Sequence, residues 1–263
     1  MNTFEKYLTP ETDKPMLYRF ALMWNKDQKI ENLQTLAQLA EPENWDTNGD
    51  KDYDILNYYL FSTFERVYAE KKLLLSKDEE YASFNTGLMT NKGEEIICLF
   101  SRLSVNSKNP QNYWRFNSFK KESDRELMSI FTETPKVASY FENFSSIYFD
   151  PTIELVKNYD HIIGDNIDRF PASLREKGDL YIQALIHSAI DLTLKKIKRS
   201  WRIATPVYYA DHITFLLPID LDGCKMALAV ELMNNRYRVN TIFDMKMAKR
   251  QARVIMKPEA GWL

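Results

Sequence analysis

The chain has 263 residues, 44% of them hydrophobic and 13% aromatic, and a formal net charge of −2 at pH 7. This composition is typical of a packed globular protein and excludes an intrinsically disordered chain. Because the net charge is close to zero, a polyanion such as RNA is not attracted by the overall field and must be met by a local patch.

Cysteine usage and hydropathy bear on the compartment. Cys98 and Cys224 lie in apolar runs with no Cys or His at metal-binding spacing, so we expect two buried, reduced thiols. Reduced thiols are typical of the cytoplasm. The N-terminal segment lacks an apolar signal core, and no apolar run approaches the roughly 20 residues that span a bilayer. We therefore expect a cytoplasmic protein with no membrane partner.

Residues 1–80 are predicted to be mainly helical. Apolar residues recur on one side of a helix over Gln28–Ala40, which Glu41-Pro42 ends. A second, longer helix is expected to begin near Asp52 or Asp54, either of which can cap it.

The middle of the chain changes to strand patterns. Ser83–Leu103 predicts two strands around a turn at residues 91–93, and Trp114–Phe119 predicts a third. A short helix is expected over Ser123–Phe131, and a further strand over Ser145–Asp150.

The last part of the chain mixes both periods. Thr152–Ile163 predicts a helix, and Glu176–Arg199 predicts the most regular helix of the chain. Three β runs follow, namely 204–221 (one or two strands), 225–232 and 236–243, with a hairpin turn at 234–235. A final helix starts after Asp244 and ends before Pro258.

These elements predict an α+β fold. Because the strands cluster and the later ones alternate with short turns, we expect a central, mostly antiparallel sheet with helices packed on it. No linker or repeat interrupts the sequence, so residues 1–263 are expected to form one domain, with 81–263 of mixed structure.

Several catalytic motifs are missing from the sequence. There is no P-loop, dinucleotide-binding glycine motif, zincin motif or nucleophile elbow. The three histidines, at 161, 187 and 212, are too far apart in sequence to favour a multi-histidine zinc site. No metal site is therefore predicted, although carboxylate-bound magnesium stays open, and the sequence indicates neither a cofactor nor an oligomeric state.

The segment His161–Pro171, HIIGDNIDRFP, carries the densest group of polar side chains. His161 can act as a general acid or base near neutral pH, and Arg169 can bind a phosphate or carboxylate through two parallel hydrogen bonds. The alternative is a polar helix end. In that case Asn166 satisfies loop backbone groups and Arg169 pairs with Asp165 or Asp168.

A second candidate is Phe84–Leu88, FNTGL. Gly87 allows a backbone conformation that other residues resist, and Asn85 and Thr86 offer an amide and a hydroxyl that could hold a nucleotide's sugar or base. The alternative is a strand end or bulge whose polar side chains are satisfied locally.

Two groups of cations form a third candidate. The first, the 195–202 cluster, comprises Lys195, Lys196, Lys198, Arg199 and Arg202; the second comprises Lys246, Lys249, Arg250, Arg253 and Lys257. With Trp201, Tyr208 and Tyr209 as stacking surfaces, they could track a phosphate backbone. Alternatively they are solvated helix faces whose charge complements the helix dipole.

The ordered segments together resemble a known family, the domain of unknown function numbered 3825. The resemblance runs from about Leu33 to Leu263. It rests on LAQLAEPENW, ILNYYLFSTFERV, FNTGL, YWRFNSF, YDHIIGDNIDRFP, ATPVYY, FLLPIDL, MALAVEL and TIFDMKMAKRQARVIMKPEAGWL.

The resemblance implies a domain joined in other proteins to cold-shock and OST-type winged-helix modules, and a candidate enzyme without a defined reaction. It points to Asn85, Thr86, Gly87, His161, Asn166, Arg169, Pro171, Pro206 and Arg253. This chain departs from the family pattern in its last helix, where Lys246, Lys249 and Gln251 stand.

We therefore expect a nucleotide- or RNA-directed protein. In the first hypothesis it is a phosphate-ester or nucleotide hydrolase: His161 is the acid/base group, Arg169 and Arg253 hold phosphate, and Asn85 and Asn166 orient the substrate. This requires these side chains to converge in one cleft. The second hypothesis is a noncatalytic RNA- or nucleotide-binding module that uses the basic clusters, and the third is a protein-interaction domain.

Overall fold

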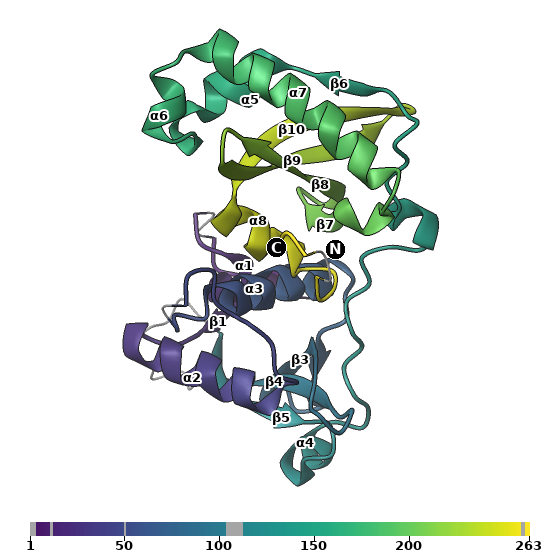
Figure 1. The fold of residues 1–263 in the computed structure, drawn as a ribbon. Coiled ribbons are helices and arrows are strands. Elements are labelled where there is room, and N and C mark those ends of the chain that lie inside the picture. The colour runs from purple at the N-terminus through teal and green to yellow at the C-terminus, as the bar shows by residue number, and fades with distance from the viewer. Residues whose placement is uncertain (1–3, 11–12, 50, 104–112, 259–260) are drawn as a thin grey trace. The chain divides into compact units, whose positions relative to one another are not determined.

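Two five-stranded sheets, each with its own helices, make up the fold of the computed structural model (Figure 1). The structure describes residues 4–10, 13–49, 51–103, 113–258 and 261–263. The chain divides into two units, Met1–Ser139 and Tyr140–Leu263. The predicted α+β class is confirmed, with two sheets where the sequence suggested one central sheet; the single domain over 1–263 stays a prediction.

Unit 1 orders its strands β1-β5-β4-β3-β2, and all neighbours are antiparallel except β1 and β5. Its elements are η1 (Glu5–Tyr7), α1 (Met16–Phe20), β1 (Ala21–Leu22), α2 (Lys26–Leu39), α3 (Asp54–Ala69), β2 (Leu74–Leu75), β3 (Tyr81–Met89), β4 (Glu95–Arg102), β5 (Trp114–Lys121) and α4 (Arg125–Ile130).

The central strand β4 shows why both faces of this sheet are covered. Its alternate residues Ile96, Cys98 and Phe100 join the large core that also contains α1, α2 and α3, whereas Ile97 and Leu99 pack with α4 on the other face. A strand buried on both faces loses the alternation of apolar and polar residues. Complete burial also raises the pKa of the Cys98 thiol well above its ordinary value, which keeps the thiol protonated.

The two N-terminal helices begin in different ways. Asn25 caps α2 through a reciprocal pair of hydrogen bonds with Gln28. The cap predicted for α3 is wrong: Tyr53, with a left-handed φ of 54°, precedes the helix and gives no side-chain cap. The carboxylate of Asp54 instead accepts hydrogen bonds from the Thr47 backbone and hydroxyl groups, so it fastens the preceding loop.

Unit 2 orders its strands β6-β10-β9-β8-β7, and all neighbours are antiparallel except β6 and β10. Its elements are η2 (Phe144–Ile147), β6 (Leu155–Lys157), α5 (Tyr159–Ile163), η3 (Gly164–Arg169), α6 (Ala172–Arg175), α7 (Asp179–Ile197), η4 (Trp201–Ile203), β7 (Thr205–Tyr209), β8 (His212–Leu221), β9 (Cys224–Met233), β10 (Arg236–Asp244) and α8 (Met245–Ala252).

The two faces of this sheet carry different helices. The buried stripe predicted for α7 packs on one face together with α5, against Met226, Leu228 and Val230 of β9. The alternate residues Ala227 and Ala229 face α8. Burying about 100 Å² of apolar surface stabilises the fold by roughly 2.5 kcal/mol, so the long stripe of α7 is a main source of stability. None of the described helices is long and apolar enough to cross a membrane.

Two predictions at the start of unit 2 are wrong. Ser145–Asp150 does not form a strand; residues 144–147 form the 3-10 helix η2, and Phe149 stacks on Tyr237 at 4.3 Å between ring centroids. The helix predicted over 152–163 starts only at Tyr159, because Leu155–Lys157 pair in parallel with the edge of β10 as β6. Pairing with a distant strand overrode the local helical pattern.

Candidate functional site

Helices α5 and η3 position the residues of the HIIGDNIDRFP segment. The side chain of Asn158 caps α5 at the backbone N–H of His161. One turn later, the Nδ1 atom of His161 hydrogen-bonds the carboxylate of Asp165. Since a carboxylate only accepts, Nδ1 carries a proton, and the Nε2 atom of a neutral ring keeps its lone pair. The His161 side chain is 41% exposed.

A buried hydrogen-bonded group, here called the Thr241 network, joins η3 to β10. The Asn166 amide donates to the carbonyl of His161 at 2.8 Å, and its oxygen accepts from the Thr241 hydroxyl at 3.1 Å. The same hydroxyl accepts from Nη1 of Arg169 at 2.7 Å, and this nitrogen also donates to the carbonyl of Ile242 at 2.6 Å. Asn166 therefore satisfies backbone groups, as the structural alternative predicted.

Arg169 keeps part of its hydrogen-bonding capacity. Its Nη1 is committed to β10, and its guanidinium lies 5.8 Å from the ring centroid of Phe243. The predicted ion pairs with Asp165 or Asp168 are wrong, because Asp165 pairs with His161 and Asp168 lies 3.9 Å from Arg175. Within the described residues Arg169 has no carboxylate partner, so its charge and its Nε and Nη2 donors can serve an anion.

The FNTGL turn forms a bulge where the pairing of β3 with β4 shifts between Asn85 and Met89. Asn85 donates to Glu95 at 2.5 Å and to the carbonyl of Pro135 at 2.9 Å, and it accepts from the Gly87 N–H at 2.9 Å. Thr86 donates to the carbonyl of Ile96 at 2.7 Å. Both side chains are fully buried and bonded to the protein itself, as the bulge alternative predicted.

Gly87 is required at this bulge for two reasons. Its φ is +74°, and a Cβ atom built on it would lie 2.6 Å from the Tyr59 hydroxyl, which donates to the carbonyl of Thr86. Any other residue would push this hydroxyl away.

The remaining predicted residues belong to unit 2. Tyr208 in β7 lies against Tyr140, with ring centroids 5.2 Å apart, and Arg253 follows the last residue of α8. Asn85, Thr86 and Gly87 belong to unit 1, whereas His161, Asn166, Arg169, Tyr208 and Arg253 belong to unit 2. Their convergence in one cleft stays a prediction.

The other two histidines also meet carboxylates. His187 lies 3.9 Å from Asp191 one helical turn away on α7, and its ring contacts the Tyr159 hydroxyl at 3.3 Å. His212 bridges the carbonyl of Ala210 at 2.8 Å and the carboxylate of Glu231 at 2.5 Å, so both of its ring nitrogens are occupied. Only His161 joins a carboxylate at hydrogen-bonding distance to an otherwise uncommitted nitrogen in the part of the chain that the structure describes.

Three carboxylates in unit 1 could offer oxygen atoms to a cation. Ligand atoms of Asp46, Asp52 and Asp54 lie within 4.8 Å of one another. Burial raises the pKa of Asp46, with further contributions from its acidic neighbours. Two of these carboxylates already accept hydrogen bonds from backbone N–H groups of the same loop. The N–H of Tyr53 donates to Asp46, and the N–H of Asp54 donates to Asp52.

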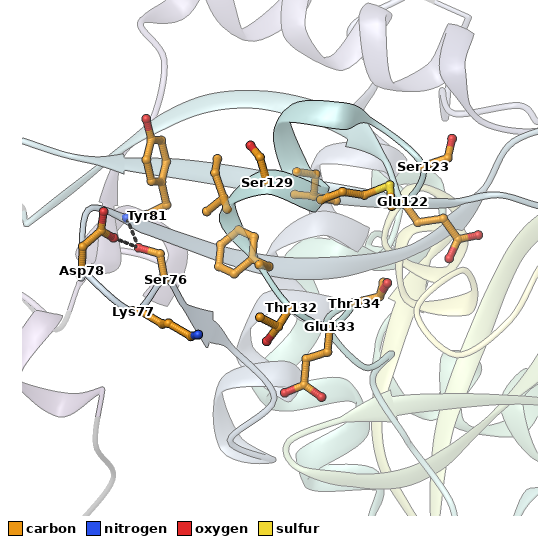
Figure 2. A pocket seen from close by; sticks show the side chains of 14 residues that line it. Ser76, Lys77, Asp78, Tyr81, Glu122, Ser123, Ser129, Thr132, Glu133 and Thr134 are labelled. Carbon is orange, nitrogen blue, oxygen red and sulfur yellow. Dashed lines mark hydrogen bonds between the residues drawn. The ribbon is translucent and has the colours of Figure 1, made fainter.

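A cavity of about 840 Å³ lies in unit 1 between the β2–β3 turn and α4 (Figure 2). Ser76 hydrogen-bonds Asp78 at one end of it, which lowers the pKa of Asp78. Among the described residues the lining holds the carboxylates of Asp78, Glu122 and Glu133 but no histidine or cysteine. Sequence reasoning gave no sign of this cavity, because the packing of α4 on the sheet creates it.

A second cavity, of about 520 Å³, lies in unit 2 beside the C-terminal end of α7. It is called the α7 cavity below. Its lining includes Lys196 and Arg202 from the 195–202 cluster. The sequence marked this region through the 195–202 cluster, but nothing in the sequence indicated a cavity.

Fold and site together define an α+β protein of two sheet-and-helix units, with a histidine–carboxylate pair and an anchored arginine in the second. The chain belongs to the family described as a domain of unknown function (DUF3825), whose model matches residues 36–262. No curated protein and no solved structure matches the chain.

The Thr241 network yields a stability prediction. Thr241→Val should destabilise the protein by about 1–3 kcal/mol, because it leaves the buried Asn166 oxygen and an Arg169 donor unpaired. Thr214→Val is the matched control: this buried hydroxyl in β8 has no hydrogen-bond partner among the described residues. Its replacement should be neutral or stabilising. Urea unfolding of both variants measures the difference, and equal losses would contradict the network's importance.

The Gly87 bulge yields a second prediction. Gly87→Ala should cost more stability than Gly93→Ala, because both glycines have positive φ but only Gly87 faces a side chain. The left-handed conformation alone costs roughly 1–2 kcal/mol, which applies to both variants. Thermal and urea unfolding compare them. A Gly87→Ala protein as stable as Gly93→Ala would show that Tyr59 moves aside freely.

Proposed function

We propose that the protein acts on a nucleotide or RNA and hydrolyses a phosphate ester, with the α5–η3 segment as the reacting site. The observation that carries the proposal is the half-exposed Arg169, which is anchored to β10 through one nitrogen and has no carboxylate partner among the described residues. A guanidinium held in this way loses little conformational freedom when it binds a phosphate.

His161 would supply the proton transfer in the same segment. Asp165 fixes the ring at Nδ1, and the carboxylate stabilises the imidazolium that forms when Nε2 takes a proton from water. The water oxygen bonds to phosphorus as the ester P–O bond breaks, and Nε2 passes the proton to the leaving oxygen. Arg169 would hold the phosphate oxygens as negative charge develops on them. Asn166 would act as a positioning residue, since its hydrogen bonds tie α5 to Thr241.

Turnover of short RNAs and nucleotides by variants tests this proposal. Removal of the proton-transferring group in His161→Ala should lower kcat by about 10²–10⁴-fold on a substrate found by screening. Arg169→Lys should lower kcat/KM, because lysine keeps the charge but loses the planar fork.

The matched control is His187→Ala, which removes the other exposed histidine with a carboxylate one helical turn away. It should keep wild-type turnover. Unchanged turnover in His161→Ala, or equal losses in both histidine variants, would overturn the assignment of His161.

The second candidate function is a noncatalytic RNA- or nucleotide-binding module. The predicted basic clusters favour it, since Lys249 and Arg250 lie in the last turn of α8 and the 195–202 cluster begins in the last turn of α7 and continues beyond it. Binding through such groups releases counterions from the nucleic acid and therefore weakens as salt is raised.

This alternative predicts that Lys249→Glu plus Arg250→Glu weakens binding to a labelled single-stranded RNA and flattens its salt dependence. Fluorescence anisotropy across a salt series measures both. The control is Asp27→Lys plus Glu31→Lys on α2 of unit 1, whose charge change is equal in size and opposite in sign. Binding that ignores both salt and the α8 charges would rule the module out.

A further inference from the structure

The α7 cavity combines an apolar interior with a cationic lining. Apolar side chains come from α7, η4, the two central strands and the start of α8, and they include Leu192, Ile203, Ile219, Met226 and Met245. The cations Lys196, Arg202 and Lys225 stand among them, together with the carboxylate of Asp220. Over the described residues, the lining therefore carries an excess of two positive charges (three cations, one carboxylate).

Two polar groups of the cavity wall, on Thr193 and Trp262, are already bonded within the protein. The Thr193 hydroxyl donates to the carbonyl of Pro218 at 2.6 Å, and the Trp262 indole N–H donates to the carbonyl of Ile203 at 3.0 Å. The second bond holds the indole in place as part of the wall. A ligand in the cavity would thus contact apolar surface and an oriented aromatic ring.

The two lysine side chains of the lining differ from these polar groups. Lys196 and Lys225 form no ion pair with any described residue, and both are exposed. Asp220 faces Lys225 across the β8–β9 ladder, but its carboxylate accepts from the Gly223 N–H at 2.7 Å. Two ammonium groups without carboxylate partners beside an apolar hollow fit a ligand that is apolar at one end and anionic at the other.

We propose that the α7 cavity is a binding site for a small organic anion with a flat, apolar ring, of which a mononucleotide is the model. Its volume falls in the range of about 300–1,000 Å³ that small-molecule sites occupy. Trp262 and the apolar side chains take the ring, and Lys196 and Lys225 take the anionic group. This site is separate from His161 and Arg169, neither of which lines it, and it does not rest on the proposed hydrolysis.

Isothermal titration with adenosine monophosphate and with anilinonaphthalene sulfonate tests the site. Both probes have a flat ring system and an anionic group, and at least one should bind with a Kd below about 1 mM. Adenosine, which has no charge, and inorganic phosphate, which has no ring, should each bind at least about tenfold more weakly than adenosine monophosphate. If neither probe binds at several times this concentration, the proposal is overturned.

Matched variants locate the binding. Lys196→Met plus Lys225→Met should raise Kd about tenfold or more, whereas Lys195→Met plus Lys198→Met should leave it unchanged. Both pairs remove the same charge from one end of the unit, but only the first pair lines the cavity. Equal effects would mean a diffuse charge effect and would overturn the assignment.

The apolar part has its own pair of variants. Leu192→Ser removes an exposed lining residue of α7, and Leu180→Ser removes a residue of the same helix that is 83% exposed and outside the cavity. Only Leu192→Ser should weaken binding.

His161→Ala and Arg169→Lys separate this proposal from the proposed function. Probe binding that survives in both but falls with the lining lysines supports the cavity, whatever their turnover. Binding lost only with His161 or Arg169 would place the ligand at the reacting site and overturn the cavity proposal.

Discussion

The backbone groups that a bulge frees from a sheet need side-chain partners, and this constraint shapes both units. In unit 1 the pairing of β3 with β4 shifts after Asn85. There the side chains of Asn85 and Thr86 hydrogen-bond backbone groups of Gly87, Pro135 and Ile96. In unit 2 the shift between Val239 and Thr241 precedes the point where Arg169 and Asn166 reach the strand. In both cases a polar residue that looks like a ligand contact in sequence supports the backbone.

Arg169 can still contact a ligand, because its bonds to β10 fix the position of the side chain and leave other donors unused. A long arginine side chain loses considerable freedom when it binds an anion. Because Nη1 is already bonded to Thr241 and Ile242 in the folded protein, much of this conformational entropy is lost on folding and not on binding. His161 is fixed in a similar way by Asp165. The α5–η3 segment thus presents two oriented groups, the imidazole of His161 and the guanidinium of Arg169.

The α7 cavity shows a second way to place charge beside apolar surface. The helix α7 buries a stripe of isoleucines along its length, and its last turn carries lysines that favour the negative end of the helix dipole. The helix dipole therefore stabilises the charge of Lys196 whether or not a ligand is bound. The chain that returns from α7 into η4 and the C-terminal Trp262 complete the wall, so the cavity needs residues from distant parts of unit 2.

Strong periodicity and turn chemistry made much of the fold predictable from sequence. The buried stripe of α7, the capped start of α8 at Asp244 and the Asn234-Asn235 turn, where both residues have positive φ, all depend on neighbours within a few positions. The same holds for the α+β class and for Gly87, whose role as a conformational exception was apparent from residue type. The close approach of Tyr59, the second reason for a glycine there, comes from α3, a helix distant in sequence.

Other features were decided only by the tertiary structure. Leu155–Lys157 became a strand because β10 offered an unpaired edge, although the local pattern favoured a helix. The partners of Arg169 lie in β10, more than 70 residues along the chain, so its expected pairing with Asp165 or Asp168 was wrong. The sequence by itself determined most of the helical and extended segments and which residues can carry charge. The tertiary structure decided what each of those side chains bonds to, because those partners are supplied by elements distant in sequence.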